Sequence, residues 1–152
     1  MSAYGATIHW QRGEAAFLDG RFSRGHVWRF DGGASVPASS SPHVLPLPLS
    51  VEEGVDPEEA FVASLSSCHM LFFLLIACKR GFVVDDYGDE AIGVMARNAE
   101  GKLAMTQVTL RPRVRYGGAA PPSRDVERAM HDEAHHRCFI ASSVKSAVTV
   151  EL

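Results

Sequence analysis

The stretch Asp56–Gly81, DPEEAFVASLSSCHMLFFLLIACKRG, decides the fold. It opens with Asp56, a typical helix N-cap residue, followed by Pro57 at the first helical position and by Glu59, which completes a capping box. It closes with Lys79-Arg80-Gly81. The two cations stabilise the C-terminal end of the helix through its dipole, and glycine ends the helix. The sequence therefore predicts one long helix between these boundaries.

The apolar part of this helix, Ala60–Cys78, approaches the length of a membrane span. It is 19 residues long and has no formal charge apart from a possible charge on His69, and a span needs about 20 apolar residues. However, Ser64, Ser66, Ser67 and His69 cluster near its middle, where polar groups are costly in lipid. We therefore expect the buried central helix of a soluble domain and keep the membrane span as the alternative.

The segments around the central helix read as strands and one further helix. Alternating residues predict strands over 6–11, 26–31 and 147–152, and a hairpin of 90–97 with 103–116. Pro112 indicates a bulge or an edge position in that hairpin, and Ser123 is a plausible cap for a helix over 123–137. Residues 34–50 hold four prolines and five serines and read as a loop. This order predicts an α+β fold in a single domain, 1–152.

Composition narrows the class of protein. The chain has 152 residues, 46% of them hydrophobic and 22% charged, which is typical of a globular domain. A net charge of −3 argues against a nucleic-acid binder. No glycine-rich dinucleotide or phosphate motif is present, so no cofactor is expected. The N-terminus lacks the basic and apolar regions of a secretory signal, so we expect a cytoplasmic protein.

The three cysteines leave two interpretations open. Cys68 lies mid-way along the helix, and Cys78 follows about 15 Å further on, too far for a disulfide between them. Cys138 follows the second helix, which makes Cys68 and Cys138 the obvious candidates for a reversible redox pair. A buried, inert thiol is the ordinary alternative for Cys68.

The histidines raise a separate hypothesis of a metal site. His131 and His135 are four residues apart on the second predicted helix, and Cys138 follows closely. Two imidazoles at this spacing can share one metal ion. A solvated helix face is the ordinary explanation of such a pair, and we expect no metal.

Two motifs resemble those of one known family. The stretch 56–69, DPEEAFVASLSSCH, is followed by 134–138, AHHRC, and by a terminal strand. The combination resembles the OsmC/Ohr family of osmotically inducible and organic-hydroperoxide-resistance proteins, in its OsmC-like branch. The resemblance covers essentially the whole chain. It implies an OsmC-like fold, in which central helices are wrapped by antiparallel sheets in an intertwined homodimer.

The resemblance also implies an activity, a thiol peroxidase acting in the oxidative stress response. Cys68 matches the family's peroxidatic cysteine, Cys138 the resolving cysteine and Glu58 the active-site carboxylate. Arg24 is the best match for the family's arginine, with Arg21 as a weaker candidate. The substrate would be an organic hydroperoxide and the reductant a dithiol. A non-catalytic protein that binds a small molecule or senses redox state is the alternative.

Helix geometry adds an expectation about the assembly. Glu58 lies ten residues before Cys68, about 15 Å along a straight helix, which is too far for contact. Either the helix breaks near its start, or Glu58 and Arg24 serve the cysteine of a partner chain, which we expect. In the organic-hydroperoxide branch proline often follows the second cysteine, where this chain has Phe139. His69 also differs there from a small or apolar residue, and we expect it to be a core or interface residue.

Overall fold

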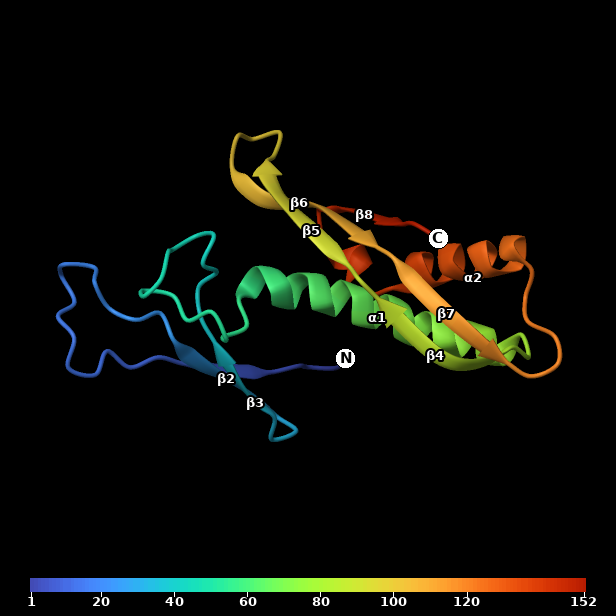
Figure 1. The fold of residues 1–152 in the computed structure, drawn as a ribbon, viewed down its shortest axis with the longest axis horizontal. Coiled ribbons are helices and arrows are strands. Elements are labelled where there is room, and N and C mark those ends of the chain that lie inside the picture. The colour runs from blue at the N-terminus through green and yellow to red at the C-terminus, as the bar shows by residue number, and fades with distance from the viewer. The chain divides into compact units, whose positions relative to one another are not determined.

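The computed structural model describes all of residues 1–152 and confirms the α+β fold class. The chain forms two compact units, Met1–Ala60 and Phe61–Leu152, which are described separately. Two α-helices, one short 3-10 helix and eight strands follow one another along the chain. Figure 1 draws the ribbon coloured from the N-terminus to the C-terminus.

The first unit contains a three-stranded antiparallel sheet in the order β1 (Ala6–His9), β2 (His26–Phe30), β3 (Ser35–Ala38). The first two strands confirm the sequence predictions, whereas β3 lies inside the segment that we expected to be a loop. Its Pro37 pairs with Val27, and β3 is an edge strand, where a missing N–H is tolerated.

The long helix α1 (Pro57–Lys79) confirms the predicted boundaries. The Glu59 N–H donates to Asp56 Oδ1 at 2.7 Å, and the Asp56 N–H donates to Glu59 Oε2 at 3.2 Å, so the capping box forms. Gly81 follows the helix with a φ of +81°, a conformation that favours glycine. By length and composition α1 could cross a membrane, a property that core helices of soluble proteins share.

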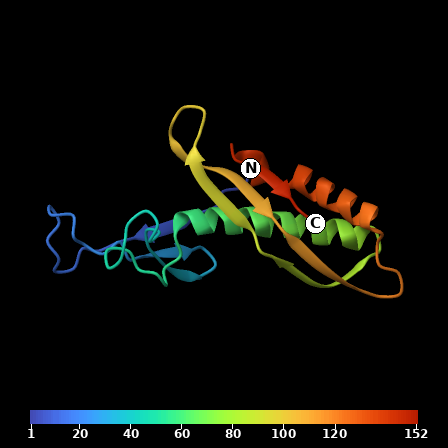
Figure 2. The same cartoon turned by 45° about the horizontal axis from the view of Figure 1, so that its top comes forward.

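The second unit contains a long, two-stranded ribbon that runs out and back beside α1 (Figures 1 and 2). One limb is β4 (Val83–Asp89) followed by β5 (Ile92–Arg97), and the other is β6 (Leu103–Leu110) followed by β7 (Pro112–Gly117). The pairs β4–β7 and β5–β6 are both antiparallel. The predicted hairpin is thus confirmed for residues 92–97 and 103–110, whereas the residues from Pro112 onward form β7, which pairs with β4. Strand β4 was not predicted.

The ribbon is held against the helix at close range. A Cβ on Gly93 of β5 would lie 2.6 Å from Val62 Cγ2 of α1, so only glycine allows this approach. The last strand, β8 (Ala147–Val150), pairs parallel to β6 and completes a three-stranded sheet. Leu65 of α1 packs with Val108 and Leu110 of β6 in one buried cluster.

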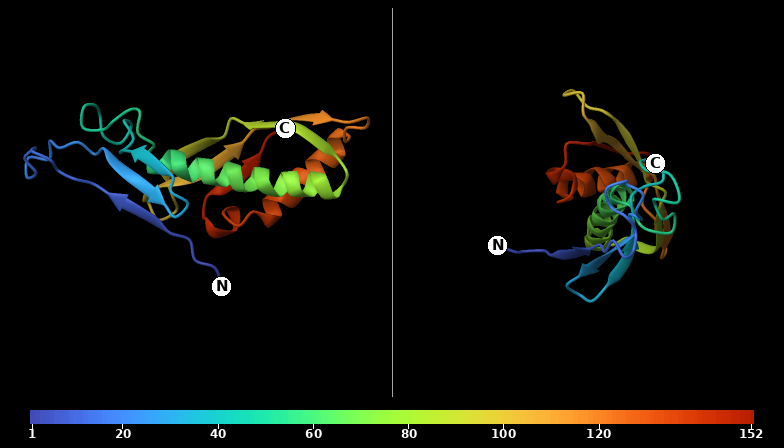
Figure 3. Two further views of the ribbon diagram at one scale, coloured as in Figure 1. Left: turned by 90° about the horizontal axis from the view of Figure 1, so that it is seen from below. Right: turned by 90° about the vertical axis from the view of Figure 1, so that its left-hand side faces the viewer.

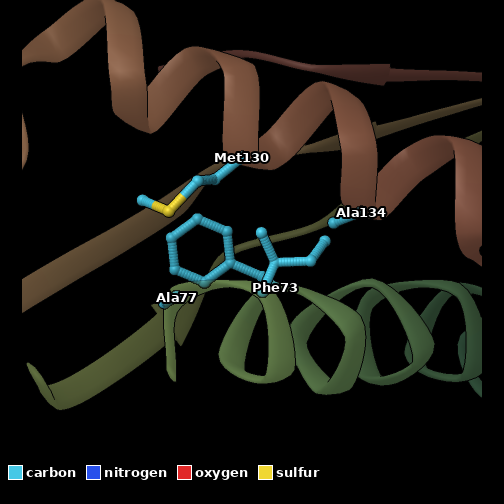
Figure 4. Packing of buried hydrophobic residues seen from close by; sticks show 5 residues of the cluster. Phe73, Ala77, Met130 and Ala134 are labelled. Atoms are coloured by element: carbon cyan, nitrogen blue, oxygen red, sulfur yellow. The ribbon is translucent and has the colours of Figure 1, made fainter. Parts of the chain in front are cut away.

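The second helix, α2 (Arg124–Arg137), lies alongside α1 (Figure 3). Ser123 caps it by accepting from the Val126 N–H, as predicted. Figure 4 shows Phe73 and Ala77 of α1 facing Met130 and Ala134 of α2, and all four side chains are buried. This contact between the helices forms the larger of the two apolar clusters of the unit.

Candidate functional site

The structure brings Cys68 and Cys138 together, although 69 intervening residues separate them. Cys68 is half-buried on α1, and Cys138 is the buried C-cap residue of α2. The two side chains are close enough for a hydrogen-bonding interaction with Cys68 to contribute to the raised pKa of Cys138. All three cysteines are unpaired, and the exposed Cys78 lies further along α1. Two thiols in hydrogen-bonding contact are candidates for a reversible disulfide.

Backbone amides hold Cys138 in place at the end of α2. Its N–H donates to the His135 carbonyl at 3.3 Å, and its sulfur accepts the Ala141 N–H at 3.3 Å. Burial, together with the hydrogen bond to Cys68, raises the pKa of Cys138 to about 11, while the amides of Ala141 and Ile140 act in the opposite direction. Cys138 is therefore a protonated thiol at neutral pH.

Aromatic contacts with α1 stabilise the position of the loop that carries Cys138. Phe139 packs edge-on against Phe72 of α1, with ring centroids 5.0 Å apart. The guanidinium of Arg137 lies over the same Phe72 ring at 5.5 Å. Phe139 therefore occupies the position after the second cysteine without moving Cys138 away from Cys68.

The first unit contains a cavity of about 440 Å³. Six of the residues that line it are Trp10, Phe22, Arg24, His26, Ser39 and Glu58. Two predicted site residues, Arg24 and Glu58, thus share one pocket. Arg21, the weaker candidate, does not line it, and its backbone N–H bonds to Asp19 at 2.9 Å. The structure therefore favours Arg24 over Arg21 as the pocket arginine.

The guanidinium of Arg24 is held by its own loop. Nη1 donates to the carbonyls of Gly20, at 2.7 Å, and Phe22, and the guanidinium lies 3.7 Å from the centroid of the Phe22 ring. The ion pairs of the chain include neither Arg24 nor Glu58. In this conformation the hydrogen-bond partners of the guanidinium are therefore carbonyls of its own loop.

The aromatic wall and the histidine of this pocket were not predicted from the sequence. Phe22 stacks on Phe17 at 4.8 Å and meets the edge of Trp10 at 5.3 Å. His26 Nε2 accepts from the Trp28 indole, so His26 Nδ1 carries the proton that it donates to the Arg24 carbonyl. Two signals in the sequence could have pointed to these side chains: the glycines at the ends of the loop and the alternating pattern of β2.

No group of three or more His, Cys, Asp or Glu side chains is arranged to hold a metal ion. His131 is fully buried, and its Nδ1 lies 2.9 Å from His69 Nε2. Cys138, the third residue of the metal hypothesis, interacts with Cys68. The imidazole pair thus joins the two helices. His69 is a core residue, which is one of the two roles expected for it.

The thiol pair lies in the second unit, and the Arg24–Glu58 pocket lies in the first. Because α1 is continuous from Pro57 to Lys79, the alternative of a helix broken near its start is excluded. Glu58 and Cys68 on this helix are therefore about 15 Å apart along its axis.

Comparisons with known proteins agree with this description. The model of the OsmC-like protein family matches residues 50–152. An OsmC-like protein of unknown function from Vibrio cholerae has 51% sequence identity and a TM-score of 0.98, with 99% of each chain covered. No curated protein matches the chain.

Two solved structures at lower identity share the fold. An organic hydroperoxide resistance protein from Elizabethkingia anophelis is 15% identical, with a TM-score of 0.71 over 99% of this chain and 96% of that one. The organic hydroperoxide resistance protein OhrB of Bacillus subtilis is 16% identical, with a TM-score of 0.66 over the same shares. The match of its family model and its similarity to the Vibrio cholerae protein show that the chain belongs to the OsmC-like protein family.

Proposed function

We propose that the protein is a cysteine-based peroxidase that reduces organic hydroperoxides to alcohols in the cytoplasm. The observation that carries the proposal is the contact of two free thiols, Cys68 on α1 and Cys138 at the end of α2. Membership of the OsmC-like family supports it, since relatives of the same fold are named organic hydroperoxide resistance proteins.

The proposed cycle has three steps. The Cys68 thiolate attacks the terminal oxygen of the hydroperoxide, the O–O bond breaks, and the alcohol leaves after taking a proton. Cys68 is then a sulfenic acid, and the sulfur of Cys138 attacks it to form a disulfide with loss of water. A dithiol reductant restores both thiols by exchange and is itself oxidised to a disulfide.

The electrostatics of Cys138 suit this order of events. While Cys68 is reduced, burial and the hydrogen bond to Cys68 keep the pKa of Cys138 high. Oxidation of Cys68 to the uncharged sulfenic acid removes its coulombic effect, which raises the pKa of Cys138, while the amides of Ala141 and Ile140 still lower that pKa. Cys138 thus becomes a better nucleophile after its target has formed.

The pocket of the first unit supplies the substrate site in this proposal, and a homodimer completes it. Arg24 and Glu58 of one chain serve Cys68 of the partner, where the guanidinium stabilises the thiolate and the aromatic wall binds the organic group. One face of α1 supports such a dimer, because Leu71 is 61% exposed and Leu75 is 41% exposed. An exposed apolar stripe of this kind marks an interaction surface.

Steady-state turnover with a dithiol reductant tests the activity. We expect wild-type protein to consume cumene hydroperoxide repeatedly and faster than hydrogen peroxide. Cys68→Ser should abolish turnover, Cys138→Ser should leave a single oxidation without a disulfide, and Cys78→Ser is the matched control with wild-type activity. Absence of repeated turnover in the wild type would favour the non-catalytic binding or sensing role.

Mixing two inactive variants tests the shared site. Heterodimers of Cys68→Ser with Arg24→Ala contain one site in which an intact Cys68 meets an intact Arg24 of the other chain. We expect subunit exchange to restore about a quarter of wild-type activity, the statistical share for a two-fold dimer. No recovery, in a mixture shown to exchange subunits, would contradict the shared site but not the peroxidase chemistry.

A further inference from the structure

A pair of buried imidazoles joins the two helices that carry the thiols. His69 of α1 and His131 of α2 are 1% and 0% exposed. His69 Nε2 lies 2.9 Å from His131 Nδ1, although 62 positions separate the residues in the chain. A hydrogen bond at this distance fixes the two helices relative to each other at one point.

Packing holds the pair in one arrangement. The His131 ring stacks on Phe73, with ring centroids 4.1 Å apart and an interplanar angle of 18°. The Tyr87 ring of β4 lies tilted beside the His131 ring, with ring centroids 6.4 Å apart. The second nitrogen of each imidazole is buried without a partner, so the N–H···N bond is the only hydrogen bond that each ring makes. The pair therefore has no alternative partner to which it can switch.

Both rings are neutral at neutral pH, which this bond requires, because one ring must donate and the other accept. Burial is the main cause that lowers the pKa of His69 to about 4 and that of His131 to about 3. The charged and titratable groups around them are His135 and Arg128 on α2 and Asp89 on β4, of which only Asp89 acts in the opposite direction.

The pair is placed where it controls the distance between the thiols. His69 directly follows Cys68 in α1, and His131 lies seven residues before Cys138, about 10 Å along α2. A shift of α2 along α1 would therefore carry Cys138 away from Cys68. A displacement of about 1 Å is enough to slow a reaction that depends on alignment.

We propose that His69 and His131 are positioning residues for disulfide formation, because their hydrogen bond holds α2 in the position along α1 at which Cys138 meets Cys68. The proposal deepens the proposed function, on which its biological meaning rests. The thiols themselves, and not the imidazoles, react.

The equilibrium between the protein dithiol and glutathione tests the proposal without any peroxide. One oxidised glutathione takes two electrons from Cys68 and Cys138, and the products are the protein disulfide and two reduced glutathiones. The equilibrium constant is the effective concentration of one thiol at the other. This readout reports alignment and does not depend on catalysis.

The informative variant is the double substitution His69→Leu/His131→Phe. It removes both polar rings together, so no unpaired imidazole is left in the core, and phenylalanine keeps the stacking on Phe73. We expect the effective concentration to fall about tenfold or more. His136→Phe, at an exposed position on the last turn of α2, is the matched control and should match the wild type.

A rescue variant covers the case in which the double substitution fails to fold. In His69→Gln the amide nitrogen can replace Nε2, so we expect an effective concentration within about threefold of the wild type. His69→Leu cannot form this hydrogen bond, and its effective concentration should fall as in the double variant. Wild-type effective concentration in the double variant, or in His69→Leu, would overturn the proposal. If the wild type consumes no peroxide but the variants differ from it in effective concentration as expected, only the proposed peroxidase activity is overturned.

Discussion

The two compact units of the chain bury their apolar residues to very different extents. In the second unit nine apolar or sulfur-containing side chains are buried, among them Leu65, Phe73 and Met130, whereas in the first unit only Ala38 is. Both units expose large apolar side chains, but those of the first unit have almost no core beneath them; they include Ile8, Trp10, Phe17, Phe30 and Leu47.

This difference shows where the stability of the chain resides. Burial of apolar surface is the dominant favourable term in folding, so the second unit has a core of its own. The first unit has a sheet and a pocket but almost no core, and its exposed apolar residues require cover from outside the unit. A partner chain in the proposed homodimer supplies such cover.

The largest effect on the comparison of the two units is expected from a substitution that introduces a charge on the exposed face of α1. Leu71→Glu places a carboxylate on the proposed dimer surface, where burying it without a partner is costly. We expect a monomer in light scattering and a loss of peroxidase activity of about a hundredfold. Lys102→Glu, on the turn between β5 and β6, is the control. A dimeric and active Leu71→Glu protein would place the interface elsewhere.

A pair of truncations compares the two units directly. Phe73 is 0% exposed between α1 and α2, and Phe73→Ala should lower the free energy of unfolding by about 3–5 kcal/mol. Phe17 is 48% exposed and contacts Trp10 and Phe22, so Phe17→Ala should cost about 1 kcal/mol. Urea denaturation measures both values, and equal losses would contradict the contrast between the units.

Acid should weaken the second unit through its buried histidines. Both have a folded pKa below 6.5, the ordinary value, at about 4 for His69 and about 3 for His131. The unfolded chain therefore binds protons below pH 6.5 that the folded chain does not. The stabilisation is complete above pH 6.5 and is lost progressively as the pH falls towards 3.

Urea denaturation at pH 7 and at pH 4 measures this loss. We expect the free energy of unfolding of the wild type to fall by on the order of 2 kcal/mol more than that of His69→Leu/His131→Phe. Because the carboxylates titrate alike in both proteins, the difference between them isolates the histidines. Parallel pH profiles would show that the pair does not resist protonation.

The smallest effect is expected at the loop that carries Cys138. Phe139 is 73% exposed, and its one aromatic contact is with Phe72. Phe139→Ala should lower the free energy of unfolding by about 0.5–1 kcal/mol. The glutathione equilibrium of the same variant measures how far this contact holds Cys138. A loss as large as that of the double histidine variant would move the positioning role from the imidazoles to the loop.

Local chemistry made several elements predictable from the sequence. The capping box of Asp56 and Glu59 and the glycine at 81 bound α1, and Ser123 marks the start of α2. Strand β4 escaped prediction because Asp85 and Asp86 interrupt its apolar pattern, and pairing with β7 overrides that weak local preference. Strand β3 was not predicted because Pro37 disfavours a strand locally, and pairing with β2 overrides that local preference.

The sequence by itself determined the two helices, the long hairpin and the cysteines that could react, because caps, turns and periodicity act over a few residues. Only the tertiary structure decided that Cys138 meets Cys68, that His69 bonds to His131, and that Arg24 and Glu58 share a pocket. These contacts join residues far apart in the chain. They depend on how the side chains of α1, α2 and the sheets pack together, which no local pattern encodes.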